Sequence, residues 1–163
     1  MKIRIIVTGG TFDKEYNELT GELYFKRTHI YDMLKLGRCK LDIVVEELMM
    51  VDSALMTDAQ REKIIEAVRN AQENQILITH GTDQMVQTAS ALGQAIKNKT
   101  VVLTGAMVPY SFGSSDGMFN LGAALAFVQT LPFGVYVAMN GRFFHWHKVI
   151  KNKNTGYFEE PKP

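Results

Sequence analysis

Small polar side chains and glycines recur in this sequence directly after short runs of apolar residues. Thr8-Gly9-Gly10-Thr11 follows the first such run, and His80-Gly81-Thr82-Asp83 follows another. Two glycines before Thr11 let the backbone turn sharply and approach a ligand closely, which leaves a threonine hydroxyl at the rim of the turn. A threonine hydroxyl is a weak nucleophile until a neighbouring group removes its proton. Asp83 could bind an ammonium group, and Thr82 could donate to or accept from a reacting centre.

Each of these turns also has a purely structural interpretation. The residues before Thr11 could form a tight turn with a threonine cap, and Thr82 or Asp83 could simply cap the helix that follows. The Gly9-Gly10 turn also resembles the start of a phosphate loop. The sequence, however, has neither Lys and Ser/Thr at P-loop spacing nor the Gly-x-Gly-x-x-Gly of dinucleotide sites. On the residues alone, a catalytic site, a structural turn and a binding site for phosphate or a nucleotide stay open.

The elements that must position these residues alternate between short β-branched runs and amphipathic segments. Strands are predicted at 3–8, 41–48, 75–79, 100–104 and 134–139, and helices at about 30–36, 57–71, 85–96 and 119–129. This order predicts an α/β fold, a doubly wound open parallel sheet with helices on both faces, as in Rossmann-like and flavodoxin-like three-layer proteins. Ligands bind at the carboxyl ends of the strands in such sheets, so we expect the polar turns to share one edge.

Length and composition limit the possible classes of protein. A chain of 163 residues fits one domain, 1–163, with an ordinary hydrophobic core. Its net charge of +1 without a basic block gives no footprint for nucleic acid, and no stretch approaches the roughly 20 apolar residues of a membrane span. A single cysteine, Cys39, cannot form an intramolecular disulfide, which favours a reducing compartment. We therefore expect a cytoplasmic protein that binds neither nucleic acid nor membrane.

Three histidines could serve as metal ligands or as structural residues. His145 and His147 flank Trp146 and would share one face of a strand, but two histidines without a third ligand are a weak metal signal. His80 is expected to satisfy its ring nitrogens at the end of a buried strand. We therefore predict no metal site.

Four motifs together resemble those of the bacterial-type L-asparaginases, a family of threonine amidohydrolases. In chain order they are Thr8-Gly9-Gly10-Thr11, His80-Gly81-Thr82-Asp83-Gln84-Met85, Thr104-Gly105-Ala106-Met107 and Ser115-Asp116-Gly117-Met118-Phe119-Asn120. Four ordered motifs at strand ends are much more specific than any one of them, and the resemblance extends to about residue 156. It implies the α/β fold of the N-terminal asparaginase domain. It also implies hydrolysis of L-asparagine to L-aspartate and ammonia through a threonine acyl-enzyme, without a cofactor.

The same resemblance implies catalytic roles for five residues. Thr11 matches the threonine nucleophile, and Thr82 and Asp83 match two members of a Thr-Lys-Asp triad. Lys151 is the candidate for the lysine of that triad, because 139–151 matches the segment that carries it. Tyr16 is the choice for a tyrosine that the family places in a mobile loop after the nucleophile.

Substrate contacts are implied in the same way, at Gly10, Ser53, Thr82, Asp83 and Ala106. Ser53 matches a hydroxyl that binds the substrate α-carboxylate, and the backbone carbonyl of Ala106 matches an acceptor for the leaving amide. Backbone N–H groups near Gly10 and Thr82 could stabilise an oxyanion.

The sequence departs from the family pattern at two positions and in length. Phe12 stands where a small aliphatic residue is usual, and Leu55 stands where an aspartate commonly precedes the methionine, so a polar partner near the α-carboxylate is lost. The classical enzymes have a second, C-terminal domain that gives an acidic residue to a neighbouring subunit's site. This sequence resembles instead the short single-domain asparaginases, including their Asn140-Gly141-Arg142. We expect a homodimer or higher homo-oligomer, because a partner surface must close the pocket.

The substitution at Leu55 and the expected lack of a second domain also motivate a different hypothesis. The same scaffold could serve as a catalytically weak amino-acid-binding or sensor module.

Overall fold

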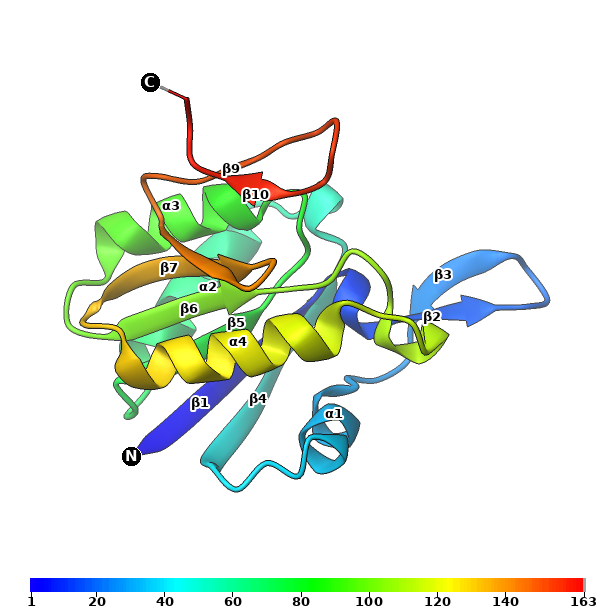
Figure 1. Ribbon diagram of the computed structural model, residues 1–163, viewed down its shortest axis with the longest axis horizontal. Helices are drawn as coiled ribbons and strands as arrows, with labels where there is room; N and C mark the ends of the chain where they lie inside the picture. The colour runs from blue at the N-terminus through cyan, green and yellow to red at the C-terminus, as the bar shows by residue number, and fades with distance from the viewer. Residues whose placement is uncertain (163) are drawn as a thin grey trace.

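A six-stranded sheet forms the centre of the protein (Figure 1). The computed structural model describes residues 1–162. The sheet order is β4-β1-β5-β6-β7-β8, in which the first five strands are parallel and β8 is antiparallel to β7. The strands are β1 (Lys2–Gly9), β4 (Asp42–Val51), β5 (Gln75–Thr79), β6 (Thr100–Thr104), β7 (Gly134–Met139) and β8 (Arg142–His145).

The parallel strands follow the flavodoxin-like order. Numbered along the chain, β1, β4, β5, β6 and β7 lie in the spatial order 2-1-3-4-5, and the direction of winding reverses between β1 and β5. The predicted α/β, doubly wound open sheet is therefore confirmed. The predicted strands at 75–79, 100–104 and 134–139 match β5, β6 and β7 in full.

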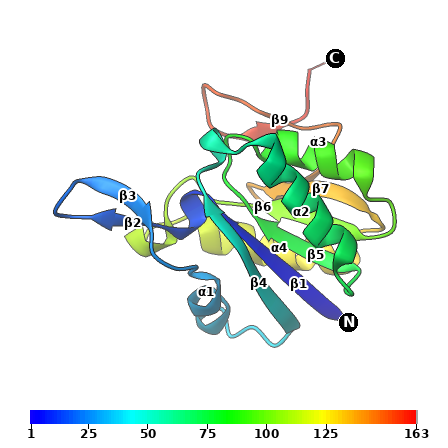
Figure 2. The same cartoon turned by 180° about the vertical axis from the view of Figure 1, so that it is seen from behind.

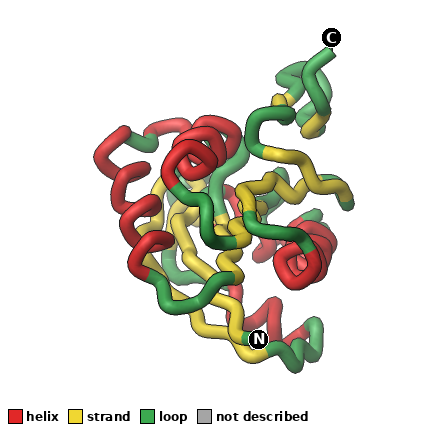
Figure 3. The backbone as a smooth tube through the Cα atoms, turned by 90° about the vertical axis from the view of Figure 1, so that its left-hand side faces the viewer, coloured by secondary structure: helices red, strands yellow, loops and turns green. Residues whose placement is uncertain are grey.

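In the described part of the chain, four α-helices cover the two faces of the sheet. They are α1 (Ile30–Leu36), α2 (Asp58–Asn70), α3 (Met85–Ala95) and α4 (Gly117–Thr130). The helix α4 lies in front of the sheet in Figure 1, and α2 lies in front of it in the reverse view of Figure 2. Figure 3 shows the resulting three layers from the side, with helices on both sides of the strands.

The core divides into two clusters, one on each face, because successive strand residues point to opposite sides. In β1, Ile6 packs in the cluster of α2 and α3, whereas Ile5 and Val7 pack in the cluster of α1 and α4. The helix α2 begins with the predicted capping box, in which the side chains of Thr57 and Gln60 each accept from the other residue's backbone N–H. In the part of the chain that the structure describes, no helix is both long and apolar enough to cross a membrane.

Residues 1–162 also form three hairpins. The first joins β2 (Lys14–Asn17) to β3 (Glu22–Phe25) and projects from the body at the right of Figure 1. The second joins β7 to β8 through Asn140 and Gly141, whose φ angles of 58° and 76° suit the type I′ turn of a two-residue hairpin. The third joins β9 (Ile150–Lys151) to β10 (Phe158–Glu159), where the sequence predicts a loop or short hairpin.

Candidate active site

The predicted polar turns meet at the carboxyl ends of β1, β5 and β6. Gly10 has a φ of 80°, and a Cβ atom there would overlap the backbone nitrogen of Gly81. A Cβ atom at Gly105 would likewise overlap the carbonyl oxygen of His80. Glycine is required at these positions because the three turns are in backbone contact. The turn before Thr11 therefore lies directly against the turn that carries Thr82.

Thr11 begins a short 3-10 helix, Thr11–Asp13, and its side chain is partly buried. The N–H group of Gly10 donates to the carbonyl of Val51 at 2.9 Å, and its carbonyl accepts from Asp13. The Gly10 N–H itself is therefore already engaged at the end of β4, and the expectation of an oxyanion donor near Gly10 stays a prediction for the neighbouring N–H groups. What Gly10 contributes is the close backbone approach.

Thr82, Asp83 and Lys151 form one hydrogen-bonded group. The Lys151 Nζ atom lies 2.8 Å from Thr82 Oγ1 and 2.8 Å from Asp83 Oδ1. Thr82 is buried, the Lys151 side chain is 17% exposed and the Asp83 side chain is 60% exposed. The group thus has a buried hydroxyl end and a carboxylate end that is open to a ligand.

Ser53 lies beside this group, in the short 3-10 helix Ser53–Leu55 that follows β4. Its buried hydroxyl accepts a hydrogen bond from the Asp83 N–H at 3.2 Å. Asp52, the residue before it, forms an ion pair with Lys14, and this pairing holds the pKa of the Asp52 carboxyl below its usual value. The start of β2 is therefore tied to the turn after β4, next to Ser53, the candidate residue for binding the substrate α-carboxylate.

Ala106 is buried in the turn after β6, and the predicted motif at 115–120 supports that turn. The carboxylate of Asp116 accepts from the N–H groups of Met107 and Val108 at 3.0 Å. The buried Asn120 donates to the carbonyl of Gly105 at 2.9 Å. In the sequence Asp116 and Asn120 are only parts of a motif, and the structure shows that both fix the backbone around Ala106.

Tyr16 is the one predicted site residue that lies apart from the others. It is in β2 of the projecting hairpin, the residue is 54% exposed, and its hydroxyl lies toward Gly21 in the same hairpin. Figure 1 shows this hairpin extending away from the sheet. Thr11, Ser53, Thr82, Asp83, Ala106 and Lys151 all lie on the turns that meet at the sheet edge, or contact them.

Asp13 closes the base of that hairpin, a role that the sequence does not predict. Its fully buried carboxylate accepts from the N–H of His29 at 2.7 Å and from the Thr28 hydroxyl at 3.1 Å. Burial raises the pKa of the Asp13 carboxyl. Its partners lie 15 and 16 residues further along the chain, so local sequence patterns carry no signal for this contact.

His80 has the structural role expected for it. Its Nδ1 lies 2.7 Å from the carbonyl oxygen of Gly81, and its Nε2 lies 2.9 Å from the Thr88 hydroxyl. Burial lowers the pKa of His80 to about 4. The ring is therefore neutral near pH 7, with Nδ1–H donating to Gly81 and Nε2 accepting from Thr88. His80 braces the turn that carries Thr82.

The two departures from the family pattern have different surroundings. Phe12 is fully buried in the core cluster of α1 and α4, so its larger side chain fills space next to the turn that carries Thr11. Leu55 is 77% exposed, and its side chain takes no part in the core.

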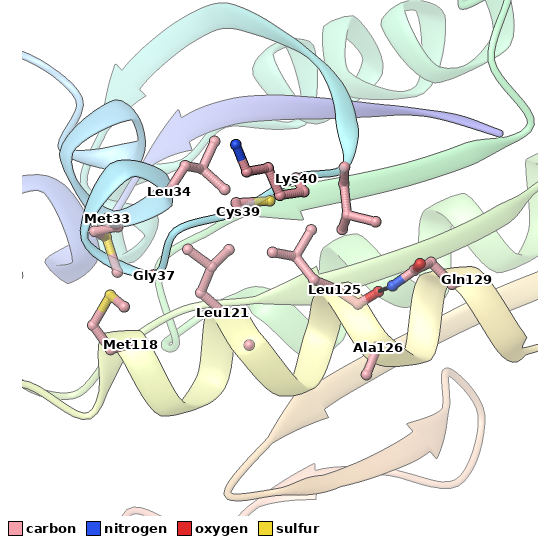
Figure 4. Close-up of a pocket in the computed structure, with 12 residues that line it drawn as sticks. Met33, Leu34, Gly37, Cys39, Lys40, Met118, Leu121, Leu125, Ala126 and Gln129 are labelled. Atoms are coloured by element: carbon pink, nitrogen blue, oxygen red, sulfur yellow. Dashed lines mark hydrogen bonds between the residues drawn. The ribbon is translucent and has the colours of Figure 1, made fainter.

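Two other features are separate from this site. The rings of His145 and His147 lie 5.6 Å apart, and residues 1–162 contain no group of three or more metal-ligating side chains. An apolar hollow of about 310 Å³ lies between α1 and α4, with Met33, Leu121 and Leu125 in its lining (Figure 4). Its lining includes none of the predicted site residues. The candidate active site is therefore the group of Thr82, Asp83 and Lys151 at the sheet edge, together with the turns around it.

Comparisons with known proteins show which family the chain belongs to. The family model described as "Asparaginase, N-terminal" matches residues 2–161. The chain is 32% identical to an L-asparaginase of Thermococcus kodakarensis over 164 residues, which covers 96% of this chain and 49% of that protein. The solved structure of the thermostable L-asparaginase from the same organism superposes with a TM-score of 0.86 and covers 98% of this chain and 51% of that one.

Two further similarities are informative. A structure titled as a probable cytoplasmic L-asparaginase from Campylobacter jejuni is 32% identical, has a TM-score of 0.81 and covers 98% of this chain and 53% of that one. A glutamyl-tRNA(Gln) amidotransferase component of Pyrobaculum aerophilum is 31% identical over 144 residues, covering 85% of this chain and 34% of that protein. The chain spans about half the length of the L-asparaginases that it matches. It spans 34% of the amidotransferase component. From the family match over residues 2–161, the chain belongs to the asparaginase family.

Proposed function

We propose that this protein is an L-asparaginase, which hydrolyses the side-chain amide of L-asparagine to L-aspartate and ammonia. The observation that carries the proposal is the group Thr82–Lys151–Asp83, with both Lys151 distances at 2.8 Å, next to the turn that carries Thr11. A buried hydroxyl held by a lysine amine is the arrangement that proton transfer requires. Relatives named L-asparaginase match this chain over almost its whole length, which supports the same chemistry.

The reaction would proceed through an acyl-enzyme on Thr11. The Thr11 oxygen attacks the amide carbon, the carbon–nitrogen bond breaks, and the proton that Thr11 loses goes to the leaving ammonia. In the second half, water attacks the ester carbon, and its proton returns to the Thr11 oxygen as L-aspartate leaves. In both halves, the Thr82 hydroxyl and the Lys151 amine would relay the proton, because they lie within hydrogen-bonding distance of each other.

Substrate binding follows from the charges around the group. The open carboxylate of Asp83 would bind the α-ammonium of the substrate, and the hydroxyl of Ser53 would donate to the α-carboxylate. The close approach of Gly10 to Gly81 would leave room for the amide end beside Thr11, and the Ala106 carbonyl would accept from the leaving amide. These contacts would recognise both charged groups of one small amino acid.

Two parts of this site would be completed by movement and by assembly. Tyr16 would reach Thr11 only when the β2–β3 hairpin closes over bound substrate. We propose that residues 1–163 act as one domain and that a second copy of the chain covers the open carboxylate side as a homodimer or higher homo-oligomer. We also propose a cytoplasmic location, which the description of the similar Campylobacter protein and the single cysteine, Cys39, support.

An amino-acid sensor is the second candidate function. The exposed Leu55 and the distance of Tyr16 from the other site residues favour it, because binding needs Ser53 and Asp83 but not a closed catalytic loop. The similarity to an amidotransferase component makes glutamine the natural competing substrate in any test.

A coupled assay of ammonia release, run with L-asparagine and L-glutamine side by side, tests the proposal. We expect saturable ammonia release from L-asparagine. Saturable binding of L-asparagine by calorimetry, with no ammonia released, would support the sensor instead. A shift of the melting temperature by phosphate, flavin or nucleotide, without any response to L-asparagine, would support the third function left open by the Gly9-Gly10 turn.

A further inference from the structure

We propose that Asn140 is a positioning residue that holds Lys151 in the active site, with Asn120 as its support. The inference rests on the proposed function in one respect, because it takes Lys151 as the catalytic lysine. Neither asparagine contacts Thr11, Thr82 or Asp83 through any hydrogen bond of the described residues. Their influence on the reaction would pass through the β9–β10 hairpin.

Asn140 joins the end of the main sheet to this hairpin. Its backbone N–H donates to Asn120 Oδ1 at 3.1 Å, and its own side-chain Oδ1 accepts from the N–H of Phe158 at 3.1 Å. Phe158 is the residue that pairs with Lys151 between β10 and β9. A single side-chain hydrogen bond therefore connects the carboxyl end of β7 to the strand pair that carries the lysine.

The hairpin needs such an anchor because it is short. Each of its strands has two residues, and isolated two-stranded hairpins are marginally stable at best. The buried Phe158 side chain attaches β10 to the core cluster of α2 and α3, and the Asn140 bond fixes the backbone at the same residue. Together with Val149, which is buried in the same cluster two residues before Lys151, these contacts hold the hairpin that carries the lysine.

Asn120 extends the connection to the neighbouring turn. It is buried in the first half of α4, where its Nδ2 donates to the carbonyl of Gly105 at 2.9 Å while its Oδ1 accepts from Asn140. One chain of hydrogen bonds thus ties the Ala106 turn to the hairpin of Lys151. Buried networks of this kind hold their members in one geometry when every member is satisfied.

The backbone at Asn140 allows a test that separates the side chain from the turn. Asn140 has a φ of 58°, in the left-handed region that glycine and aspartate also adopt readily in type I′ turns. Asn140→Gly keeps the turn and removes the acceptor of the Phe158 N–H. Asn140→Asp keeps both the turn and an acceptor oxygen, so it serves as the conservative rescue.

The experiment measures kcat and KM for L-asparagine together with hydrogen exchange at the amides of Phe158, which donates to Asn140, and of Asn152, which donates across the hairpin to Tyr157. We expect Asn140→Gly to lower kcat about 10- to 100-fold, because a misplacement of about 1 Å at a catalytic group costs that much, with KM within about threefold of wild type. Exchange at the Phe158 amide should accelerate roughly five- to tenfold. Asn140→Asp should return both kcat and exchange to within about fivefold of wild type.

The matched control is Thr130→Ala, which also removes a hydrogen bond from a side chain to the backbone. Thr130 donates to the carbonyl of Ala126 at 3.1 Å, at the opposite end of α4, and its loss should change neither readout. A kcat within about twofold of wild type in Asn140→Gly, or an Asn140→Asp variant as impaired as Asn140→Gly, would overturn the inference. So would an increase in KM at unchanged kcat.

Failure of the proposed function would appear differently, as a wild-type protein that releases no ammonia. In that case, hydrogen exchange at the Phe158 and Asn152 amides is the measurement that decides the inference. Faster exchange in Asn140→Gly, restored in Asn140→Asp, would support the anchoring of Lys151, and equal exchange in all variants would overturn it.

Discussion

Replacing His80 with glutamine should flatten the pH dependence of this protein's stability. His80 is fully buried, and its ring contacts Gly81 and Thr88 in the neutral form. Protonation would place a positive charge in the core and remove the acceptor for the Thr88 hydroxyl, so the folded state resists it. Glutamine has a donor and an acceptor but does not titrate in this range.

The magnitude follows from the two pKa values of His80. The unfolded chain takes up a proton at His80 near pH 6.5, whereas the folded protein does so only at about 4. Between these values the unfolded state binds more protons, so the free energy of unfolding decreases as the pH falls. The stability is fully present above about pH 6.5 and is lost progressively toward about pH 4. From about pH 7.5 to about pH 5, the His80 contribution to this loss is about 2 kcal/mol.

Urea unfolding followed by the fluorescence of Trp146, the only tryptophan, measures this effect. The difference in unfolding free energy between the two pH values should be about 2 kcal/mol smaller in His80→Gln than in the wild type. His145→Gln is the matched control, because the His145 side chain is exposed, and it should keep the wild-type difference. Equal pH dependence in the wild type and His80→Gln would refute the burial argument for His80.

Two further changes test the buried hydrogen bonds of Asp13 and the packing of α3 against Trp146. Asp13→Ala should lower the free energy of unfolding by about 2 to 3 kcal/mol, because the Thr28 hydroxyl and the His29 N–H lose a buried acceptor. Urea unfolding measures this loss, and a value below about 0.5 kcal/mol would contradict the prediction. Gly93→Ala should cost about 1 to 3 kcal/mol, because its Cβ atom would overlap the Trp146 ring. Its control, Gly122→Ala in α4, meets nothing within 4 Å and should instead stabilise by about 0.5 to 1 kcal/mol in the same measurement.

The elements best predicted from the sequence are the strands that helices cover on both faces. The strands at 75–79, 100–104 and 134–139 are almost continuously apolar because helices cover both faces of the sheet there, and the structure places them at the predicted residues. The β2–β3 hairpin is absent from the predicted elements because each strand has only four residues and none of them is buried, so no apolar period marks it.

The strand β8 is not among the predicted elements, although the sequence contains a pattern that indicates it. Asn140-Gly141 is predicted only as a turn at the sheet edge, although Asn-Gly between a strand and a run of aromatic residues is typical of a tight hairpin. A hairpin at this position implies β8 as an antiparallel strand next to β7, which is what the structure shows.

The candidate site could be predicted only in part, because several of its residues contact partners that lie far away in the sequence. Thr11, Thr82 and Asp83 follow predicted strands, so topology alone places them at one edge. Lys151 lies 69 residues from Thr82 in a basic stretch, and only the family resemblance points to it. Asp13 and Asn140 act through partners 15 to 20 residues away, which single-sequence patterns do not reveal.

The most direct test of the central claim is ammonia release from L-asparagine by the wild type and by Thr11→Val, a nearly isosteric change that removes only the hydroxyl. Thr82→Val and Lys151→Met are measured beside it, with circular dichroism to confirm an intact fold. We expect saturable turnover by the wild type and losses of about 10³-fold or more in each variant. Turnover by Thr11→Val within about tenfold of the wild type would contradict a threonine acyl-enzyme at this site.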